Sequence, residues 1–276
     1  MSLFCCPICR APLASESGGG PLRCPNRHSF DRAAEGYVHL LPSNKMHAKI
    51  PGDSKEMVAA RRSFLAAGYY DLFLDGAAEI LSGRLESFWP PVLLDAGCGE
   101  GSYTGRVFRA LSAVTAPRVA GVDISKFAVR AAAKRFHEIE FAVASIFDLP
   151  FADGAADGIL AVFSPIVPAE FRRVLRRGGV LLLAVPGPRH LFGLKEQLYE
   201  KPYENGRKDT EYPGFRFEER IPIRSEIIVE GKDQIQNLFA MTPYYWKTGV
   251  EGAARLRKLG RLPTEIEFDF LCYRAI

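Results

Sequence analysis

The stretch Leu-Leu-Asp-Ala-Gly-Cys-Gly-Glu-Gly at residues 93–101 decides the fold. It joins an apolar run that begins at Val92 to a segment, 102–113, with the residue pattern of a helix. Glycines between a buried strand and a helix let the backbone turn tightly against a ligand. The stretch therefore predicts a strand, a ligand-binding loop and a helix in that order.

The flanking sequence repeats this alternation. Helical stretches cover 126–136 and 169–175, and strand-like apolar runs lie at 119–122, 141–143, 158–162 and 180–185. Nearly continuous apolar strands between helices are typical of a parallel sheet covered on both faces. Residues 215–229 alternate as antiparallel strands do, and a final strand over 265–273 follows a helix over 251–259. The predicted class is α/β with a mostly parallel sheet.

The loop also indicates its ligand. Asp95 stands two residues before Gly97, and Gly97, Gly99 and Gly101 form a G-x-G-x-G pattern. A dinucleotide site prefers G-x-G-x-x-G against a pyrophosphate, which a carboxylate repels, whereas the same carboxylate suits the ammonium and sulfonium of S-adenosylmethionine (SAM). Asp123 ends the next strand, where an acid accepts ribose hydroxyls. Either aspartate alone could cap the following helix; together they predict a SAM site.

A cysteine cluster at the N-terminus predicts a metal site. Cys6 and Cys9 form C-x2-C, and Cys24 and His28 follow after fourteen residues as C-x3-H. Three thiolates and one imidazole close a tetrahedral shell, which is typical of structural zinc. Cys5 with Cys9 has a less usual x3 spacing, so Cys6 is the preferred ligand.

The positive charge of the chain is concentrated near this cluster. Residues 1–62 hold nine Lys/Arg and five Asp/Glu, while the remainder holds 27 of each sign. The net charge of +4 therefore lies entirely within residues 1–62. Arginines near aromatic rings suit the phosphates and bases of RNA, although Phe30 and Tyr37 could instead form the small core around zinc. The candidate RNA-binding residues are Arg10, Arg23, Arg27 and Arg32.

Length and composition limit the remaining possibilities. The 276 residues are 47% hydrophobic and 25% charged, as in soluble globular proteins, with no apolar run of membrane-spanning length. The N-terminus lacks a secretory pattern, so we expect a cytoplasmic protein. The predicted parts are a zinc module over 1–42, a linker and connecting helix over 43–68 that breaks at Gly68, and a cofactor-binding domain over 69–276 with a substrate-side insertion over 200–245.

Over residues 92–186 the chain resembles the class I SAM-dependent methyltransferase superfamily, which implies a Rossmann-like, mostly parallel sheet of seven strands. The runs 148–151 and 171–175 and the Gly178-Gly179 pair share in the resemblance. The chain has Ala144-Ser145 where many members carry an acid for the adenine amino group, so the expected adenine contact rests on Ser145. Arg177 also replaces a common proline.

Over nearly its full length the chain resembles the RlmA family of 23S ribosomal RNA (rRNA) guanine-N1 methyltransferases. The most specific runs, besides the loop and the cysteine motifs, are 35–42, 51–54, 60–62, 186–191 and 241–243. The resemblance implies a zinc-binding RNA-recognition module, a SAM-binding catalytic domain and methylation of a guanosine in a domain II hairpin loop of 23S rRNA, with a homodimer left open.

The resemblance also implies residue roles. The family's zinc ligands fall on Cys6, Cys9, Cys24 and His28, and its cofactor contacts fall on Tyr70, Gly99, Glu100 and His190. Without the resemblance, Tyr70 would be read as a core tyrosine.

Methylation of guanine N1 requires loss of the proton on that nitrogen, and therefore a positioned base and a proton acceptor. Phe163, at the end of the fourth predicted strand, is expected to stack on a flipped-out base, and His190 is the candidate acceptor. Two alternatives are a small-molecule or other RNA methyltransferase with a structural zinc ribbon, and a binding module without catalysis.

Overall fold

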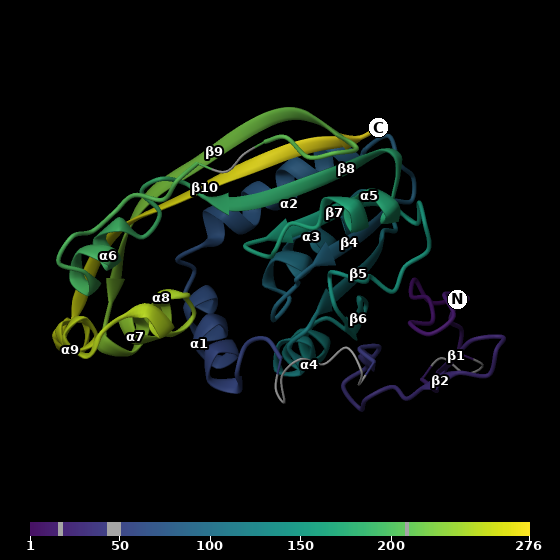
Figure 1. The fold of residues 1–276 in the computed structure, drawn as a ribbon, viewed down its shortest axis with the longest axis horizontal. Coiled ribbons are helices and arrows are strands. Elements are labelled where there is room, and N and C mark those ends of the chain that lie inside the picture. Colours follow the sequence, from purple (N-terminus) through teal and green to yellow (C-terminus); the bar gives the residue numbers. More distant parts are fainter. Residues whose placement is uncertain (16–18, 43–50, 208–209) are drawn as a thin grey trace.

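The computed structural model describes residues 1–15, 19–42, 51–207 and 210–276. Its main feature is an eight-stranded sheet in the order β3-β6-β5-β4-β7-β8-β10-β9 (Figure 1). The strands are β3 (Val38–His39), β4 (Val92–Ala96), β5 (Arg118–Asp123), β6 (Glu140–Val143), β7 (Ala156–Val162), β8 (Leu175–Pro186), β9 (Phe215–Glu230) and β10 (Arg261–Ala275). A separate antiparallel pair consists of β1 (Leu22–Arg23) and β2 (Ser29–Phe30).

The helices are α1 (Lys55–Ala66), α2 (Asp71–Leu85), α3 (Ser102–Ser112), α4 (Lys126–Arg135), α5 (Pro168–Val174), α6 (Phe192–Leu198), α7 (Lys232–Ala240), α8 (Tyr244–Lys247) and α9 (Val250–Lys258). The side chain of Ser54 caps α1 by accepting a hydrogen bond from the Met57 N–H. The predicted break at Gly68, where φ is +82°, separates α1 from α2. Within the described ranges, no helix combines the length and apolar character needed to span a membrane.

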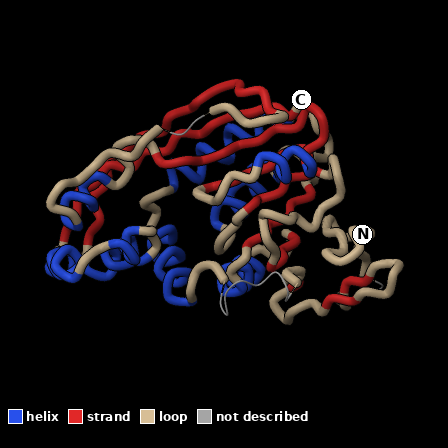
Figure 2. The backbone as a smooth tube through the Cα atoms, viewed as in Figure 1, coloured by secondary structure: helices blue, strands red, loops and turns tan. Residues whose placement is uncertain are grey.

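Strands β3 to β8 run parallel, and β10 is antiparallel to both β8 and β9. The predicted α/β class is confirmed, with one strand more than the expected seven. The additional strand is β3, which comes from the predicted zinc module and pairs with β6 through Val38 and His39. Residues 215–229, expected as several short strands, lie in the single 16-residue strand β9, which runs beside β10 along one side of the molecule (Figure 2).

Successive residues of β4 point to opposite faces of the sheet, and each face carries its own core. Leu93 belongs to the core shared with α2, α3 and α4, whereas Leu94 belongs to the core that includes α5. The second core also takes Phe4, Leu13 and Leu22 from the N-terminal module, and Phe4 meets Phe151 edge to face at 5.3 Å. The N-terminal module is therefore packed onto the sheet.

Candidate active site and zinc site

The glycine loop lies at the carboxyl ends of β4 and β5. The N–H groups of Gly97 and Cys98 both donate to the carbonyl of Val122 at 2.9 Å, which ties the loop to β5. Gly97 has φ of +91°, and a Cβ there would stand 2.6 Å from the Cβ of Ser164. Only glycine fits this close approach, so the loop is held in one shape between β5 and the end of β7.

Asp123 links the loop to the end of β5. One carboxylate oxygen accepts the Gly99 N–H at 3.0 Å, and the other accepts the Ser125 N–H at 2.8 Å. Burial raises the pKa of this carboxyl group, although the two hydrogen bonds oppose the change. A carboxylate offers about four acceptor positions, so each oxygen can still accept a ligand hydroxyl. The placement fits the ribose contact expected from the sequence.

Asp95 is only 1% exposed and has an incomplete set of partners. Its Oδ2 accepts the Thr104 hydroxyl at 2.6 Å, but no group in the described part of the chain donates to its buried Oδ1. Burial raises the pKa of Asp95 to about 7, and the nearby Asp123 adds to this. A buried carboxylate with a free oxygen is stabilised by a cation, so the site fits the positively charged methionine portion of SAM.

Arg61 is a site residue that the motif analysis did not single out. From α1, its Nη1 pairs with the carboxylate of Asp53 and stands 3.8 Å from where a Cβ of Gly99 would lie. Its Nη2 donates to the Met241 carbonyl at 3.3 Å. In the sequence, Arg61 belongs to the run 60–62, which indicates the family resemblance but gives Arg61 no role of its own. Arg61 thus places a cation beside the cofactor loop and joins α1 to the segment after α7.

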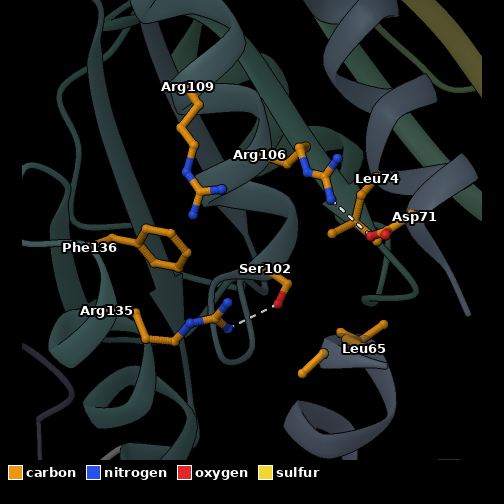
Figure 3. Close-up of a pocket in the computed structure, with 9 residues that line it drawn as sticks. Leu65, Asp71, Leu74, Ser102, Arg106, Arg109, Arg135 and Phe136 are labelled. Atoms are coloured by element: carbon orange, nitrogen blue, oxygen red, sulfur yellow. Dashed lines mark hydrogen bonds and ion pairs between the residues drawn. The ribbon is translucent and has the colours of Figure 1, made fainter. Parts of the chain in front are cut away.

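The side chain of Glu100 supports the loop from behind. It is 2% exposed, pairs with Arg135 at 2.6 Å and accepts the Ser102 N–H at 3.2 Å. Figure 3 shows the adjoining cavity of about 220 Å³, into which Arg106, Arg109 and Arg135 point from α3 and α4. Neither Asp95 nor Asp123 lines this cavity. The cofactor contact expected of Glu100 therefore stays a prediction.

Four rings gather beside the loop. The Phe268 ring lies 5.3 Å from Tyr70, 4.6 Å from Phe163 and 5.1 Å from His190. Tyr70 is 3% exposed and is thus also a core residue, whereas Phe163 is 46% exposed. Phe163 adopts φ of +51°, a strained conformation for a residue with a Cβ. Phe268 was missed because a ring in a buried strand carries no functional signal.

The hydrogen bonds of His190 define its tautomer. Its Nδ1 accepts the backbone N–H of Glu267 at 3.2 Å, so the proton lies on Nε2, which faces the Tyr70 hydroxyl at 3.5 Å. Burial lowers the pKa of His190 to about 3, and the charge of Lys195 contributes. A neutral imidazole whose only lone pair is already engaged is a donor, which argues against the proton-acceptor role expected from the sequence.

Ser145 lies at the edge of the same site. The N–H of Ala144 donates to the Asp123 carbonyl at 3.0 Å, and Ser145 follows as the second residue beyond the end of β6. Its hydroxyl oxygen accepts the Phe147 N–H at 3.2 Å. Its contact with adenine stays a prediction.

The N-terminal cluster has the dimensions of a zinc site. The ligand atoms of Cys6, Cys9, Cys24 and His28 all lie within 4.8 Å of one another, and Cys5 is not among them. The Cys9 and Cys24 sulfurs are 3.7 Å apart, and the His28 Nδ1 is 3.5 Å from the Cys6 sulfur and 3.3 Å from that of Cys24. Ligands at zinc bond lengths and tetrahedral angles lie about 3.4–3.8 Å apart. The backbone N–H of Ala11 is the main cause that lowers the pKa of Cys9 to about 6, favouring a thiolate.

The four arginines expected to bind RNA have different surroundings. Arg23 and Arg27 are exposed. Arg10 pairs with Asp148 and donates to the Leu149 carbonyl at 2.7 Å, and Arg32 donates to the Gly36 carbonyl at 2.8 Å. Arg10 therefore helps to attach the module to the catalytic domain. Of the two rings that could form the small core around zinc, Phe30 packs on the core that contains Cys6 and Cys24, whereas Tyr37, 5% exposed, is buried in the core shared with α1 and α2.

A family model described as RlmA, N-terminal matches residues 4–49, and a methyltransferase-domain model matches residues 93–179. The chain is 34% identical to the 23S rRNA (guanine(748)-N(1))-methyltransferase of Streptomyces fradiae, over 94% of this chain and 90% of that protein. It is 38% identical to a Micromonospora griseorubida protein provisionally named a 23S rRNA (guanine-N1)-methyltransferase, over 70% of this chain and 68% of that protein. The chain therefore belongs to the RlmA family of 23S rRNA guanine-N1 methyltransferases.

Proposed function

We propose that this chain transfers a methyl group from SAM to N1 of a guanosine in a domain II hairpin loop of 23S rRNA. Its relatives named for guanine-N1 methylation support the reaction and the substrate class. The observation that carries the cofactor assignment is Asp95, buried with one carboxylate oxygen that no described residue satisfies. This substrate also implies that the enzyme works in the cytoplasm.

Bound SAM supplies an activated methyl group on a positively charged sulfur. The chain would hold it through groups at the ends of two neighbouring strands: Asp95 would balance the positive charge, and the carboxylate of Asp123 would accept the ribose hydroxyls. Arg61, beside Gly99, offers a guanidinium to the methionine carboxylate. Ser145 would border the adenine.

The target base stacks on Phe163. The exposed half of this ring follows β7, and Ser164 fixes the backbone by donating its hydroxyl to the Ala96 carbonyl at 2.8 Å, directly before the glycine loop. A guanine that leaves its loop and stacks there is held close to the methyl donor. Strain in the Phe163 backbone is consistent with a functional position.

Methyl transfer would form the N1–CH3 bond as the S–CH3 bond of SAM breaks, leaving S-adenosylhomocysteine, and the N1 proton would pass to solvent water. Loss of this proton places negative charge on the guanine, largely on O6. The Nε2–H of His190 faces the Tyr70 hydroxyl at 3.5 Å, so His190 would stabilise that charge through this hydroxyl, which can accept from the imidazole and donate to O6; a pKa of about 3 keeps the imidazole neutral. We propose this role for His190 in place of proton acceptance.

The zinc module supplies part of the RNA surface. A closed Cys3His shell leaves no position for catalysis, so the metal maintains the shape of the module. Arg23 and Arg27 lie exposed on it, and Arg27 is placed to contact phosphates. The decisive experiment is mass mapping of rRNA fragments after incubation with labelled SAM. Label on N1 of a loop guanosine supports the proposal, and label elsewhere, or on small molecules alone, refutes it.

A further inference from the structure

Three exposed aromatic side chains lie on the C-terminal side of the active site. Tyr203, Tyr245 and Trp246 are 52%, 46% and 70% exposed. Tyr245 and Trp246 belong to the one-turn helix α8, and Tyr203 lies in the connection that follows α6. We propose that these three residues, here named the stacking surface, bind the unpaired nucleotides next to the target guanosine.

The rings of α8 are held rigidly. The Thr242 hydroxyl donates to the Phe239 carbonyl at 2.9 Å before the helix, and the Thr248 hydroxyl donates to the Tyr244 carbonyl at 2.8 Å after it. The Tyr245 ring packs against Trp246 at 5.1 Å and against the ring of Phe239 at 5.3 Å. Rings fixed in this way lose little conformational freedom when a ligand stacks on them.

Tyr203 is anchored to the same region. The Lys195 Nζ lies 4.6 Å from the Tyr203 ring and 5.7 Å from the ring of Tyr244 in α8. The same Nζ donates to the Tyr203 carbonyl at 2.9 Å and to the Asn205 side chain at 2.7 Å. Lys195 thus connects α6, the loop after it and α8.

The stacking surface borders the active site. Met241, three residues before α8, accepts a hydrogen bond from Arg61, which stands beside the cofactor loop. On the other side, the charge of Lys195 acts on His190. In Figure 1, α7 to α9 and the zinc module lie toward opposite ends of the molecule, with α1 and α4 between them. An RNA loop over the active site can therefore be contacted from both ends.

The charge of α8 and α9 favours RNA as the occupant. Residues 244–258 carry Lys247, Arg255, Arg257 and Lys258 against the single acid Glu251. Aromatic faces stack on any base, and neighbouring cations attract the backbone, so this combination is typical of surfaces that bind single-stranded nucleic acid. The competing occupant is a second copy of the chain, which light scattering distinguishes from RNA.

The chain offers a matched pair of probes, because its two tryptophans are Trp89 and Trp246. Trp89 is 71% exposed and precedes the amino end of β4, whereas the glycine loop follows the carboxyl end of the same strand. The full-length protein is titrated with a hairpin RNA carrying the domain II loop, without SAM. In the Trp89→Phe variant, RNA quenches the fluorescence of Trp246; in the Trp246→Phe variant, the fluorescence of Trp89 stays constant.

Kinetics provide the second measurement. Trp246→Ala raises the KM for the hairpin about 5- to 150-fold, the range for loss of one stacked base, with kcat and the Kd for SAM unchanged. Trp246→Tyr retains most of the affinity, and Trp89→Ala matches the parent.

The inference rests on the proposed function, and the outcomes separate the two. If no variant binds or methylates the hairpin, both fail. If the hairpin is methylated with unchanged KM and an unresponsive Trp246, the proposed function stands and the stacking surface is overturned. A change in molar mass by light scattering in Trp246→Ala, with unchanged KM, assigns the surface to contact between copies and also overturns the inference.

Discussion

Replacement of Asp95 by Asn tests the electrostatic basis of the cofactor site. Burial raises the pKa of Asp95 from 3.8 to about 7. Ionisation of this carboxyl group therefore destabilises the folded state relative to the unfolded chain. The cost is absent below about pH 4, grows as the pH rises towards 7, and is complete above it. A shift of about three pKa units corresponds to about 4 kcal/mol.

Without SAM, the Asp95→Asn variant is therefore expected to be more stable than the parent, by about 2 kcal/mol at pH 5.5 and about 4 kcal/mol at pH 8.5. Denaturant unfolding at the two pH values measures this difference. The control is Asp269→Asn, because Asp269 is equally buried at 3% exposure but pairs with Arg220. Loss of that ion pair is expected to lower stability at both pH values.

If SAM supplies the missing cation, its binding is expected to lower the pKa of Asp95 and release a proton. At pH 7, where about half of Asp95 is protonated, about 0.5 proton leaves per SAM bound. Calorimetry in buffers of different ionisation enthalpy measures this number, and the Asp95→Asn variant isolates the contribution of Asp95. The reasoning is refuted if the variant is less stable than the parent at pH 8.5, or if parent and variant release the same number of protons.

Four further perturbations probe the rest of the site. Arg61→Gln is expected to weaken SAM binding about tenfold, because the cation beside Gly99 is lost; calorimetry measures this with the exposed neighbour variant Arg62→Gln as the control. Phe163→Ala is expected to reduce kcat/KM for RNA about 5- to 150-fold while the Kd for SAM holds, and Phe163→Tyr retains activity in the same assay. His190→Asn is expected to lower kcat without moving the pH–rate profile between pH 5.5 and 9, since burial keeps the pKa of His190 near 3. If the variant loses one limb of that profile, His190 is the proton acceptor after all. Cys24→Ser is expected to abolish zinc binding and lower Tm, whereas Cys5→Ser retains one zinc per chain by elemental analysis; equal zinc contents contradict the ligand assignment.

The sequence predicted those features that depend on short-range pattern. Strand and helix alternation, the Gly97 loop and the Cys24 motif are each encoded within a few consecutive residues, so spacing alone identified them. The break at Gly68 was likewise local.

Features set by long-range packing could not be predicted in this way. Strand β3 has two residues and exists because Val38 meets Ala142 of β6, which no local pattern indicates. The Arg61 contacts with Asp53 and Met241 join positions separated by up to 180 residues. The engaged Nδ1 of His190 depends on Glu267 in β10, so residue type indicated an acid–base role that the packing does not support.

The charge around the glycine loop accounts for the choice of a cationic cofactor. The charge of Asp123 raises the pKa of Asp95, and the charge of Asp53 raises the pKa of Asp123. The negative charge around the loop therefore exceeds the positive charge that Arg61 supplies. A pyrophosphate would add two negative charges to this excess, whereas a sulfonium and an ammonium remove it. Arg61 also contacts Met241, so the group that balances the cofactor site is attached to the segment that carries α8. We therefore expect cofactor affinity and the position of the proposed RNA-binding surface to depend on the same side chain.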